Sequence, residues 1–255
     1  MKAIILAAGY ATRLYPLTIN TAKPLLKIHG RPIIDYILDS VSHVGDIDKT
    51  IIITNNKFYQ QFENWLDEKP KSFTQRIVLI NDGSNCVEDR FGAIGDIQLA
   101  LNTIGYDDDV LIIAGDNFFD FDLNNFVRIV QEREFFPTIA VYLPNNHPDL
   151  RRFGIVLLNE TGQIVSFEEK PEKPRSNLIA TCIYFMPKEK LFLISKYLES
   201  GNHKDTPGSF IQWLVGKDKV YACICEGVWF DLGDFESLSE VLLYLNNRYA
   251  LKTDP

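Results

Sequence analysis

Short apolar runs alternate with segments of helical spacing along the first half of this chain. The runs are rich in Ile and Val and occupy residues 3–7, 50–54, 77–80 and 110–114, each before a polar or glycine-containing turn. Runs of this kind are typical of parallel strands that are buried on both faces. The alternation therefore predicts a doubly wound α/β sheet, in which ligands collect at the carboxyl ends of the strands.

The second half of the chain has a different pattern. Strands with few helices between them are predicted at residues 137–143, 153–158, 163–169 and 178–186, which indicates an antiparallel or mixed extension of the sheet. The prediction is completed by helices near 188–199 and 207–215, a strand near 219–224 and a last helix at about 235–248.

Composition limits both the number of domains and the class of ligand. A chain of 255 residues with 46% apolar content is enough for one α/β core, so we expect a single domain over residues 1–255. A net charge of −8 argues against a nucleic-acid surface. The first apolar run ends at Ala8, too early for a membrane span. The cysteines, at positions 86, 182, 223 and 225, have neither a zinc nor a disulfide spacing, which indicates buried thiols in the cytoplasm.

A loop of small residues follows the first predicted strand. It begins Leu6-Ala7-Ala8-Gly9, and small residues let backbone N–H groups approach an anionic ligand. Arg13 adds a planar guanidinium group whose N–H donors suit phosphate oxygens. The loop is neither a Walker loop nor a dinucleotide fingerprint, because Ala11 and Leu14 stand where the latter needs glycine. Lys23 could reach the same phosphates, although a lysine taken alone is more often a solvated surface residue.

The stretch from Lys2 to Ile33 resembles the signature of the sugar-phosphate nucleotidylyltransferases. In that family the motif is L-A-A-G-x-G-T-R-L-x-P-L-T, followed by P-K-P-L and G-x-P. The chain departs from it at Ala11 and Ala22, where the family has glycine and proline. Ala11 leaves the torsions of the loop open, because glycine adopts positive φ freely and alanine does not. The matching residues are Gly9, Thr12, Arg13, Leu14, Pro16, Lys23, Pro24, Gly30 and Pro32.

Further motifs extend the resemblance over nearly the whole chain. It implies a Rossmann-like, doubly wound mixed sheet of the nucleotide-diphospho-sugar transferase type in three α/β/α layers. Residues 1–117 would be mainly nucleotide-binding and residues 118–233 mainly sugar-phosphate-binding, and a homo-oligomer is common in the family. The further motifs are Gly92-Ala93-Ile94-Gly95, Gly115-Asp116-Asn117, Phe153-Gly154, Glu168-Glu169-Lys170-Pro171 and Trp229-Phe230-Asp231-Leu232-Gly233.

The activity that the resemblance implies is Mg²⁺-dependent transfer of a nucleotidyl group from a nucleoside triphosphate to a sugar 1-phosphate, with release of pyrophosphate. Asp116 follows a predicted strand at its carboxyl end, where a carboxylate can hold Mg²⁺ against a phosphate, although Gly-Asp alone is more often a turn. The resemblance assigns Asp116 and Asp231 to the metal, Arg13 to the β- and γ-phosphates and Lys23 to the triphosphate. The other nucleotide-binding positions that it implies are Leu6, Ala8, Gly9, Thr12, Asn81 and Gly92.

The acceptor site is also implied by the resemblance. Glu169 would bind sugar hydroxyls, Lys170 the sugar phosphate and the Gly154 backbone the sugar, with Asn117 beside it. Tyr184 lies in a strand similar to one in the family that ends G-I-Y, and it is as often a core residue as a contact. Cys182, in the same strand, stands where the family has glycine, and we expect it to crowd or reshape the sugar pocket.

The nucleobase is indicated only by Asn81, which follows the third predicted strand. Thymidylyl and uridylyl members of the family have a Gln there that binds the pyrimidine edge, and Asn has the same amide on a shorter arm. The sequence thus favours dTTP or UTP. A CTP-dependent cytidylyltransferase acting on a sugar phosphate, or on a small phosphate such as phosphocholine, is an alternative.

Two hypotheses from other classes are less well supported. A dinucleotide-binding oxidoreductase would need the missing glycines and an acidic residue after the second strand, where Thr54-Asn55-Asn56 stands. A non-catalytic regulatory protein that binds nucleotide sugars would be expected to have lost a catalytic residue, yet Lys23, Asp116 and Asp231 are all present.

Overall fold

The computed structural model describes residues 1–74, 76–145 and 148–253. Four parallel strands form one half of its main sheet, in the order β6-β1-β4-β5. These strands match the four apolar runs of the first half of the sequence. Their bounds are β1 (Lys2–Leu6), β4 (Lys49–Thr54), β5 (Ile77–Asn81) and β6 (Val110–Ala114).

The other half of the sheet is mixed, as the sequence predicts. Strand β11 (Leu178–Met186) runs antiparallel to β6 and joins the two halves, so that Ile183 pairs with Ile113. Antiparallel pairs then connect β11 with β9 and β9 with β10, while β8 pairs with β11 and is followed by the parallel strand β12. The remaining bounds are β8 (Thr138–Tyr142), β9 (Gly154–Leu158), β10 (Ile164–Glu169) and β12 (Tyr221–Ile224).

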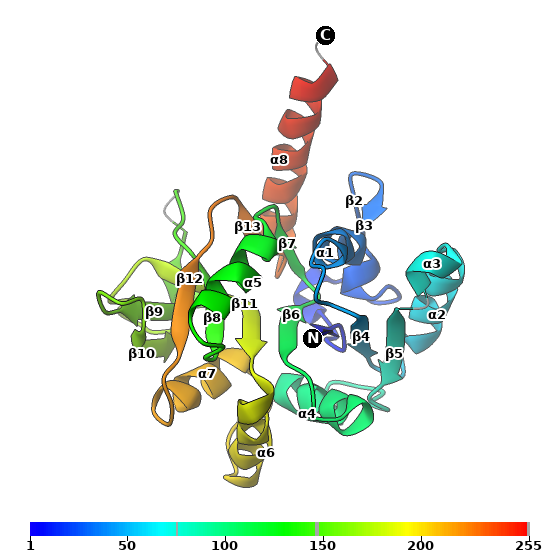
Figure 1. The fold of residues 1–255 in the computed structure, drawn as a ribbon. Helices are drawn as coiled ribbons and strands as arrows, with labels where there is room; N and C mark the ends of the chain where they lie inside the picture. The colour runs from blue at the N-terminus through cyan, green and yellow to red at the C-terminus, as the bar shows by residue number, and fades with distance from the viewer. Residues whose placement is uncertain (75, 146–147, 254–255) are drawn as a thin grey trace.

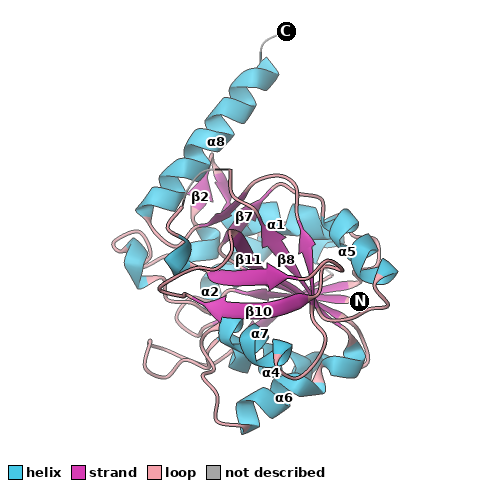
Figure 2. Ribbon diagram, turned by 90° about the vertical axis from the view of Figure 1, so that its left-hand side faces the viewer, coloured by secondary structure: helices cyan, strands magenta, loops and turns pink. Residues whose placement is uncertain are grey.

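Helices cover both faces of this sheet and give three layers. Figure 2 shows α1 and α5 above the strands and α4, α6 and α7 below them. Alternate side chains of one strand enter opposite cores, since Ile5 belongs to the core with α1 and Ile4 to the core with α4. The helices are α1 (Ile33–Ser42), α2 (Tyr59–Asp67), α3 (Lys71–Thr74), α4 (Ala93–Ile104), α5 (Leu123–Glu132), α6 (Phe192–Glu199) and α7 (Pro207–Val215).

A smaller unit lies at one end of the sheet. Strands β7 (Asn117–Phe119) and β13 (Trp229–Asp231) form an antiparallel ribbon, and a third apolar core holds helix α8 (Phe235–Thr253) to it. Beyond this contact α8 extends away from the body (Figure 1). A short hairpin, β2 (Lys27–Ile28) with β3 (Arg31–Pro32), precedes α1.

Helix α5 is the main element that the sequence analysis missed. Its apolar residues recur at helical spacing, as Leu123, Phe126, Val127 and Val130, and all four are buried. The side chain of Asp122 caps the helix by accepting a hydrogen bond from the Asn124 N–H. Both signals are present in the sequence, so this helix could have been predicted. The ribbon strands β7 and β13 were also not predicted, because each is only three residues long.

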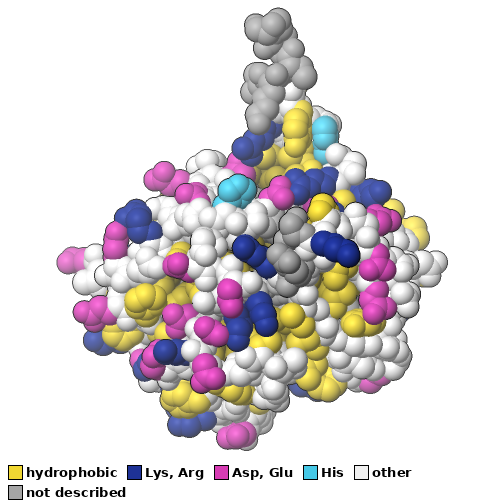
Figure 3. Space-filling model, turned by 45° about the vertical axis from the view of Figure 1, so that its right-hand side comes forward, with side chains coloured by type: hydrophobic (Ala, Val, Ile, Leu, Met, Phe, Trp, Pro, Cys, Tyr) yellow, Lys and Arg dark blue, Asp and Glu magenta, His cyan; other side chains and the backbone are white. Residues whose placement is uncertain are grey.

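One face of the surface carries both acidic and basic side chains (Figure 3). On the face shown in Figure 3, basic side chains are interspersed with acidic ones and do not gather into a stripe. Among the described residues, none of the helices combines the length and the apolar character needed to span a bilayer.

Candidate active site

A cavity of about 560 Å³ opens at the carboxyl ends of β1 and β6, where the parallel and mixed halves of the sheet meet. Its wall comes from the loop after β1, the start of α4, the β6–β7 turn, strands β9 to β11 and the segment before α7. Most of the residues singled out in the sequence lie on it. They are Leu6, Ala8, Gly9, Arg13, Gly92, Asp116, Asn117, Gly154, Glu169, Lys170, Tyr184 and Asp231.

The loop after β1 keeps a glycine-like backbone at Ala11. This residue has φ 47° and ψ 45°, the left-handed region, and its carbonyl accepts a hydrogen bond of 2.7 Å from the Thr18 hydroxyl. The Asn55 side chain donates to the Ala8 carbonyl at 2.9 Å and holds the loop against β4. The loop therefore adopts the turn that glycine would allow, at the cost of about 1 kcal/mol or more of local strain.

Lys23 is buried, which excludes the solvated surface position that a lysine alone would suggest. It lies in a short 3₁₀ turn, Lys23–Leu25, and its Nζ is 2.8 Å from Oδ2 of Asp116. Lys23 does not line the main cavity but a smaller one of about 200 Å³, which also touches Arg13, Asp116 and Gly233. Asp116 thus lines both cavities, as does Arg13.

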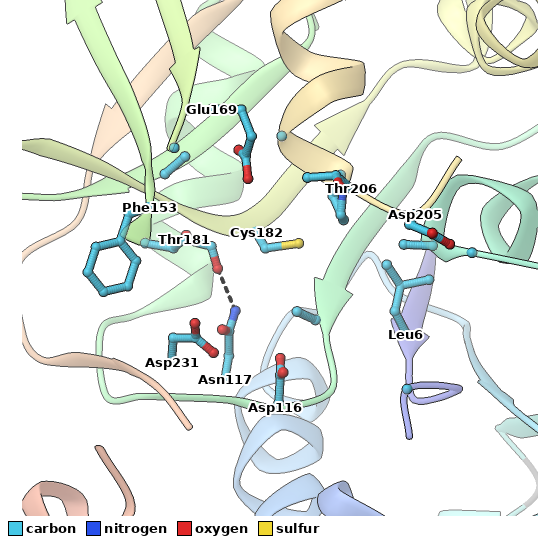
Figure 4. Close-up of a pocket in the computed structure, with 18 of the residues that line it drawn as sticks. Leu6, Asp116, Asn117, Phe153, Glu169, Thr181, Cys182, Asp205, Thr206 and Asp231 are labelled. Atoms are coloured by element: carbon cyan, nitrogen blue, oxygen red, sulfur yellow. Dashed lines mark hydrogen bonds between the residues drawn. The ribbon is translucent and has the colours of Figure 1, made fainter. Parts of the chain in front are cut away.

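Asp116 and Asp231 come together through the ribbon. In the β7–β13 pairing Asp231 is opposite Asn117, and the Leu232 N–H donates to the Asp116 carbonyl at 3.1 Å. Figure 4 shows the two carboxylates on either side of the Asn117 side chain, at the same end of the cavity. Residues more than a hundred positions apart in sequence therefore form one acidic pair.

The electrostatics of the pair differ between its two members. Burial pushes the pKa of Asp116 upward, but Lys23 and then Arg13 outweigh burial, so that the pKa is lowered. Burial and the charge of Asp116 raise the pKa of Asp231 to about 6. The charge of Asp116 thus opposes ionisation of Asp231, and a cation bound at both carboxyl groups would offset that repulsion.

The donor set suits Mg²⁺. Magnesium usually takes one or two carboxylates and completes its coordination with water and substrate phosphates. Asp116 and Asp231 supply two carboxylates in the cavity wall. Within the described residues, no cluster of three or more His, Cys, Asp or Glu side chains is arranged to hold a metal ion, so a site made only of such protein ligands is not available here.

Glu169, at the end of β10, lies in a slot between two glycines. A Cβ on Gly208 in α7 would be 1.8 Å from its Oε2, and one on Gly154 in β9 would be 3.2 Å from the same atom. Burial raises the pKa of Glu169, and the charge of Lys170 opposes this shift. Lys170 has φ 47°, which ends the strand alternation, and its Nζ is 3.7 Å from Glu169.

The floor of the cavity is formed by β11. The Asn117 side chain donates to the Thr181 carbonyl at 2.6 Å and ties β7 to this strand. Cys182 has φ 57° in mid-strand, and Figure 4 shows its sulfur pointing into the cavity. Tyr184 is almost fully buried, yet it also lines the wall.

Two predicted nucleotide contacts, Thr12 and Asn81, are not among the residues that line either cavity. The Asn81 amide donates to the Asn56 side chain and accepts from the Gly83 N–H, both at 2.8 Å. The wall near Gly92 is made instead by residues that the sequence analysis did not single out. They are Tyr10, Asp82, Arg90, Asp96 and Asp205. Asp96 had a visible signal, because it interrupts the apolar face of α4 between Ile94 and Ile97.

Known proteins with the same fold match the chain over nearly its whole length. The computed structure superposes on a putative glucose-1-phosphate thymidylyltransferase from Bacillus anthracis, solved with sucrose, with a TM-score of 0.81 and 24% identity over 96% of this chain and 94% of that one. At this identity the likeness establishes the fold, a mixed α/β sheet between helical layers.

Two curated relatives are more similar in sequence. The bifunctional protein GlmU of Methanocaldococcus jannaschii is 31% identical over 97% of this chain and 55% of its own length. A glucose-1-phosphate adenylyltransferase of Clostridium novyi is 31% identical over 93% of this chain and 65% of its own length. The chain therefore spans between half and two thirds of these relatives. The family model described as nucleotidyl transferase matches residues 2–248. Together with the cavity, in which the family's signature residues converge, this match shows that the chain belongs to the nucleotidyl transferase family.

Proposed function

We propose that this chain transfers a nucleotidyl group from a nucleoside triphosphate to a sugar 1-phosphate. An oxygen of the sugar phosphate attacks the α-phosphorus and forms a P–O bond, while the bond to the β-phosphate oxygen breaks and pyrophosphate leaves with the electron pair. The observation that carries the proposal is the group at the carboxyl ends of β1 and β6, in which the Lys23–Asp116 ion pair lies beside Arg13 and Asp231.

Each residue of this group has a defined task in the proposal. Two anionic substrates repel each other, and Arg13 and Lys23 offset that repulsion and the charge that gathers on the departing pyrophosphate. Asp116 and Asp231 would hold Mg²⁺, which supplies further positive charge at the phosphate oxygens. The acceptor phosphate is itself the nucleophile, so no covalent enzyme intermediate is required.

The acceptor is proposed to lie against β9, β10 and β11. Glu169, buried between Gly154 and Gly208, is suited to accept hydrogen bonds from sugar hydroxyls. Lys170 places an ammonium group beside it, available to the sugar phosphate. In this arrangement residues 1–117 bind mainly the nucleotide and residues 118–233 mainly the acceptor.

The proposed donors are dTTP and UTP. Asn81 is not the support for this choice, because its amide is bound to Asn56 and Gly83. The support is the wall near Gly92, where Asp96 offers a carboxyl group to a base. CTP, with a sugar phosphate or phosphocholine as acceptor, is the second candidate. Cytosine, like uracil and thymine, presents one hydrogen-bond donor beside one hydrogen-bond acceptor.

A cytoplasmic location and a homo-oligomeric state complete the proposal. All four cysteines lie in the described part of the chain and are free thiols. A reducing compartment maintains that state.

The test is pyrophosphate release from five triphosphates, each combined with a panel of sugar 1-phosphates and with phosphocholine, in Mg²⁺ and in chelator. We expect turnover only with Mg²⁺. Asp116→Asn and Asp231→Asn should each lower kcat at least about a hundredfold and leave the circular dichroism spectrum unchanged, because they remove charge without removing volume.

Asp67→Asn is the matched control, since Asp67 is exposed at the end of α2. It should keep full activity. Undiminished turnover in Asp231→Asn, or in chelator, would contradict the metal assignment. Tight binding of a nucleotide sugar without pyrophosphate release in any combination would favour the regulatory alternative.

A further inference from the structure

The wall of the cavity near Gly92 contains three carboxyl groups, and two of them are already occupied. Both oxygens of Asp82 accept hydrogen bonds from the Ser84 hydroxyl, at 2.8 and 2.9 Å. Asp205 binds the Arg90 guanidinium through two bonds, of 3.0 and 2.7 Å. These two groups are therefore held by protein partners and have limited capacity for a ligand.

Asp96 is the third, and it differs from the other two. It is 5% exposed, it lines the cavity, and its Oδ1 is fully buried with no hydrogen-bond partner among the described residues. A buried polar group without a partner costs free energy, about 1 to 3 kcal/mol. Native structures keep few such groups, and Asp96 is one whose residue also lines a cavity in which a ligand can supply the missing partner.

The position of Asp96 determines which part of a ligand it can meet. It lies in the first turn of α4, on the half of the molecule proposed to bind the nucleotide. The Ile94 N–H donates to the Lys204 carbonyl at 2.9 Å, which fixes this end of α4 against the segment before α7. Arg13 and Asp116 belong to the loops after β1 and β6, so a triphosphate bound there has its nucleoside free to extend toward α4.

We propose that the Asp96 carboxyl group binds an edge of the nucleobase and selects an edge that presents one hydrogen-bond donor beside one acceptor, as uracil and thymine do. This inference rests on the proposed function, because it takes the cavity to hold a nucleoside triphosphate. The sequence alone favours the amide of Asn81 for this task.

The chemistry follows from the surroundings of Asp96. Burial, and then the charges of Asp82 and Asp205, raise its pKa to about 8, while Lys204 opposes the shift. A carboxyl group with this pKa is mostly protonated at pH 7. It then offers one O–H donor and one C=O acceptor, the pattern of an amide. The ionised form only accepts, and would suit the two N–H donors on the N1–N2 edge of guanine.

The other titratable groups around Asp96 differ in the direction of their pKa shifts. Asp205 has its pKa lowered by the hydrogen bonds from Arg90, so it is ionised at neutral pH. Burial raises the pKa of Asp82, and the Ser84 hydrogen bonds oppose this shift. Tyr10, whose hydroxyl donates to Ser84 at 3.1 Å, has a raised pKa because of burial and stays neutral.

The experiment compares Asp96→Asn with Asp96→Ala. Binding of UTP, dTTP, CTP, ATP and GTP to the full chain is measured by calorimetry from pH 7 to 9, and kcat/KM for each is measured by pyrophosphate release. Affinity of the unchanged protein for UTP or dTTP should fall as pH rises through about 8, by up to tenfold per pH unit, because one proton is lost from Asp96.

Asp96→Asn should keep the pH 7 affinity and lose its pH dependence, since the amide has one donor and one acceptor at every pH. Asp96→Ala should weaken binding of the preferred triphosphate about ten- to a hundredfold. The affinities of the five triphosphates should become more similar, and the KM for the acceptor should not change. The control is Asp107→Asn, an exposed change just beyond the other end of α4, which should alter nothing.

Three results would overturn the inference. They are an unchanged order of triphosphate affinities in Asp96→Ala, a fall in UTP affinity with pH that persists in Asp96→Asn, and tighter binding of GTP than of UTP or dTTP at pH 7. Failure of the proposed activity would look different. Nucleotide binding that depends on Asp96, without pyrophosphate release from any combination, would remove the activity and leave the role of Asp96 intact.

Discussion

Two residues of the cavity wall, Ala11 and Cys182, adopt backbone torsions that favour glycine. Their φ values are 47° and 57°, both in the left-handed region. At both positions the sequence departs from a glycine of the family it resembles. The backbone thus keeps the left-handed torsions although glycine is absent, because the surrounding sheet and loop contacts determine them. The added side chain at Cys182 points into the cavity (Figure 4).

Cys182→Gly should raise the free energy of unfolding by about 0.5 to 1 kcal/mol, because it removes the left-handed strain. Glycine also raises the conformational entropy of the unfolded chain, which offsets only part of that gain. Urea unfolding without ligand measures the change. Cys182→Ala is the matched control, since it removes the sulfur and keeps the strain, and it should show no gain. Equal stabilities of the Gly and Ala variants would mean that the torsion is not strained.

At the scale of elements, the β7–β13 ribbon determines whether the acidic pair forms. It has only three residues in each strand, too few for an independent hairpin, and it depends on the apolar core beneath α8. Leu232 follows Asp231 directly and is fully buried in that core together with Leu245 of α8. Packing of α8 therefore holds Asp231 in place.

Leu245→Ala should lower the free energy of unfolding by about 2 to 4 kcal/mol, because it leaves a cavity between α8 and the ribbon. Leu243 lies on the same helix but is 63% exposed, so Leu243→Ala should change stability by no more than about 0.5 kcal/mol. Urea midpoints at constant m-value test both. Similar losses in the two variants would show that the contribution of Leu245 does not come from its burial in this core.

At the scale of the whole molecule, the nucleotide and acceptor halves share one sheet. The β6–β11 pairing crosses between them, and the two large cores on either face include residues from both halves. Separation of the halves would therefore break sheet hydrogen bonds and expose both cores. On the ground of this continuity in the described residues, we propose that residues 1–255 form a single domain.

We expect one cooperative unfolding transition for the whole chain. Trp65 lies in the first half, and Trp213 and Trp229 lie in the second. A variant that keeps only Trp65 therefore reports on the first half by its fluorescence, and a variant that keeps only the other two reports on the second. In urea, both sets and the far-ultraviolet circular dichroism should change at the same midpoint. Two separated transitions would contradict the single domain.

Much of the fold could be predicted from local patterns. The strands β1, β4, β5 and β6 matched apolar runs, because a buried parallel strand needs apolar residues on both faces. Helix α5 was missed although Asp122 and its apolar spacing predict it. The ribbon strands could not be predicted, since three residues have no detectable period.

The candidate site was predictable to a similar extent. The signature loop and the motifs around Asp116, Glu169 and Asp231 were recognisable, and these residues line one cavity. Asn81 was chosen for its amide and its place after a strand, but those features do not indicate where a side chain points. Its neighbours Asn56 and Gly83 bind it outside the cavity wall.

The amino-acid sequence by itself determined the order of strands and helices, the family and the chemical groups available, because apolar spacing and contiguous motifs are local properties of a chain. The tertiary structure decided which of those groups meet. Burial of Lys23 against Asp116, the ribbon that brings Asp231 to them, and the unpartnered carboxyl group of Asp96 all depend on contacts between distant segments. Burial and neighbouring charge arise only when the chain is packed, so partners and pKa values could not be derived from residue order.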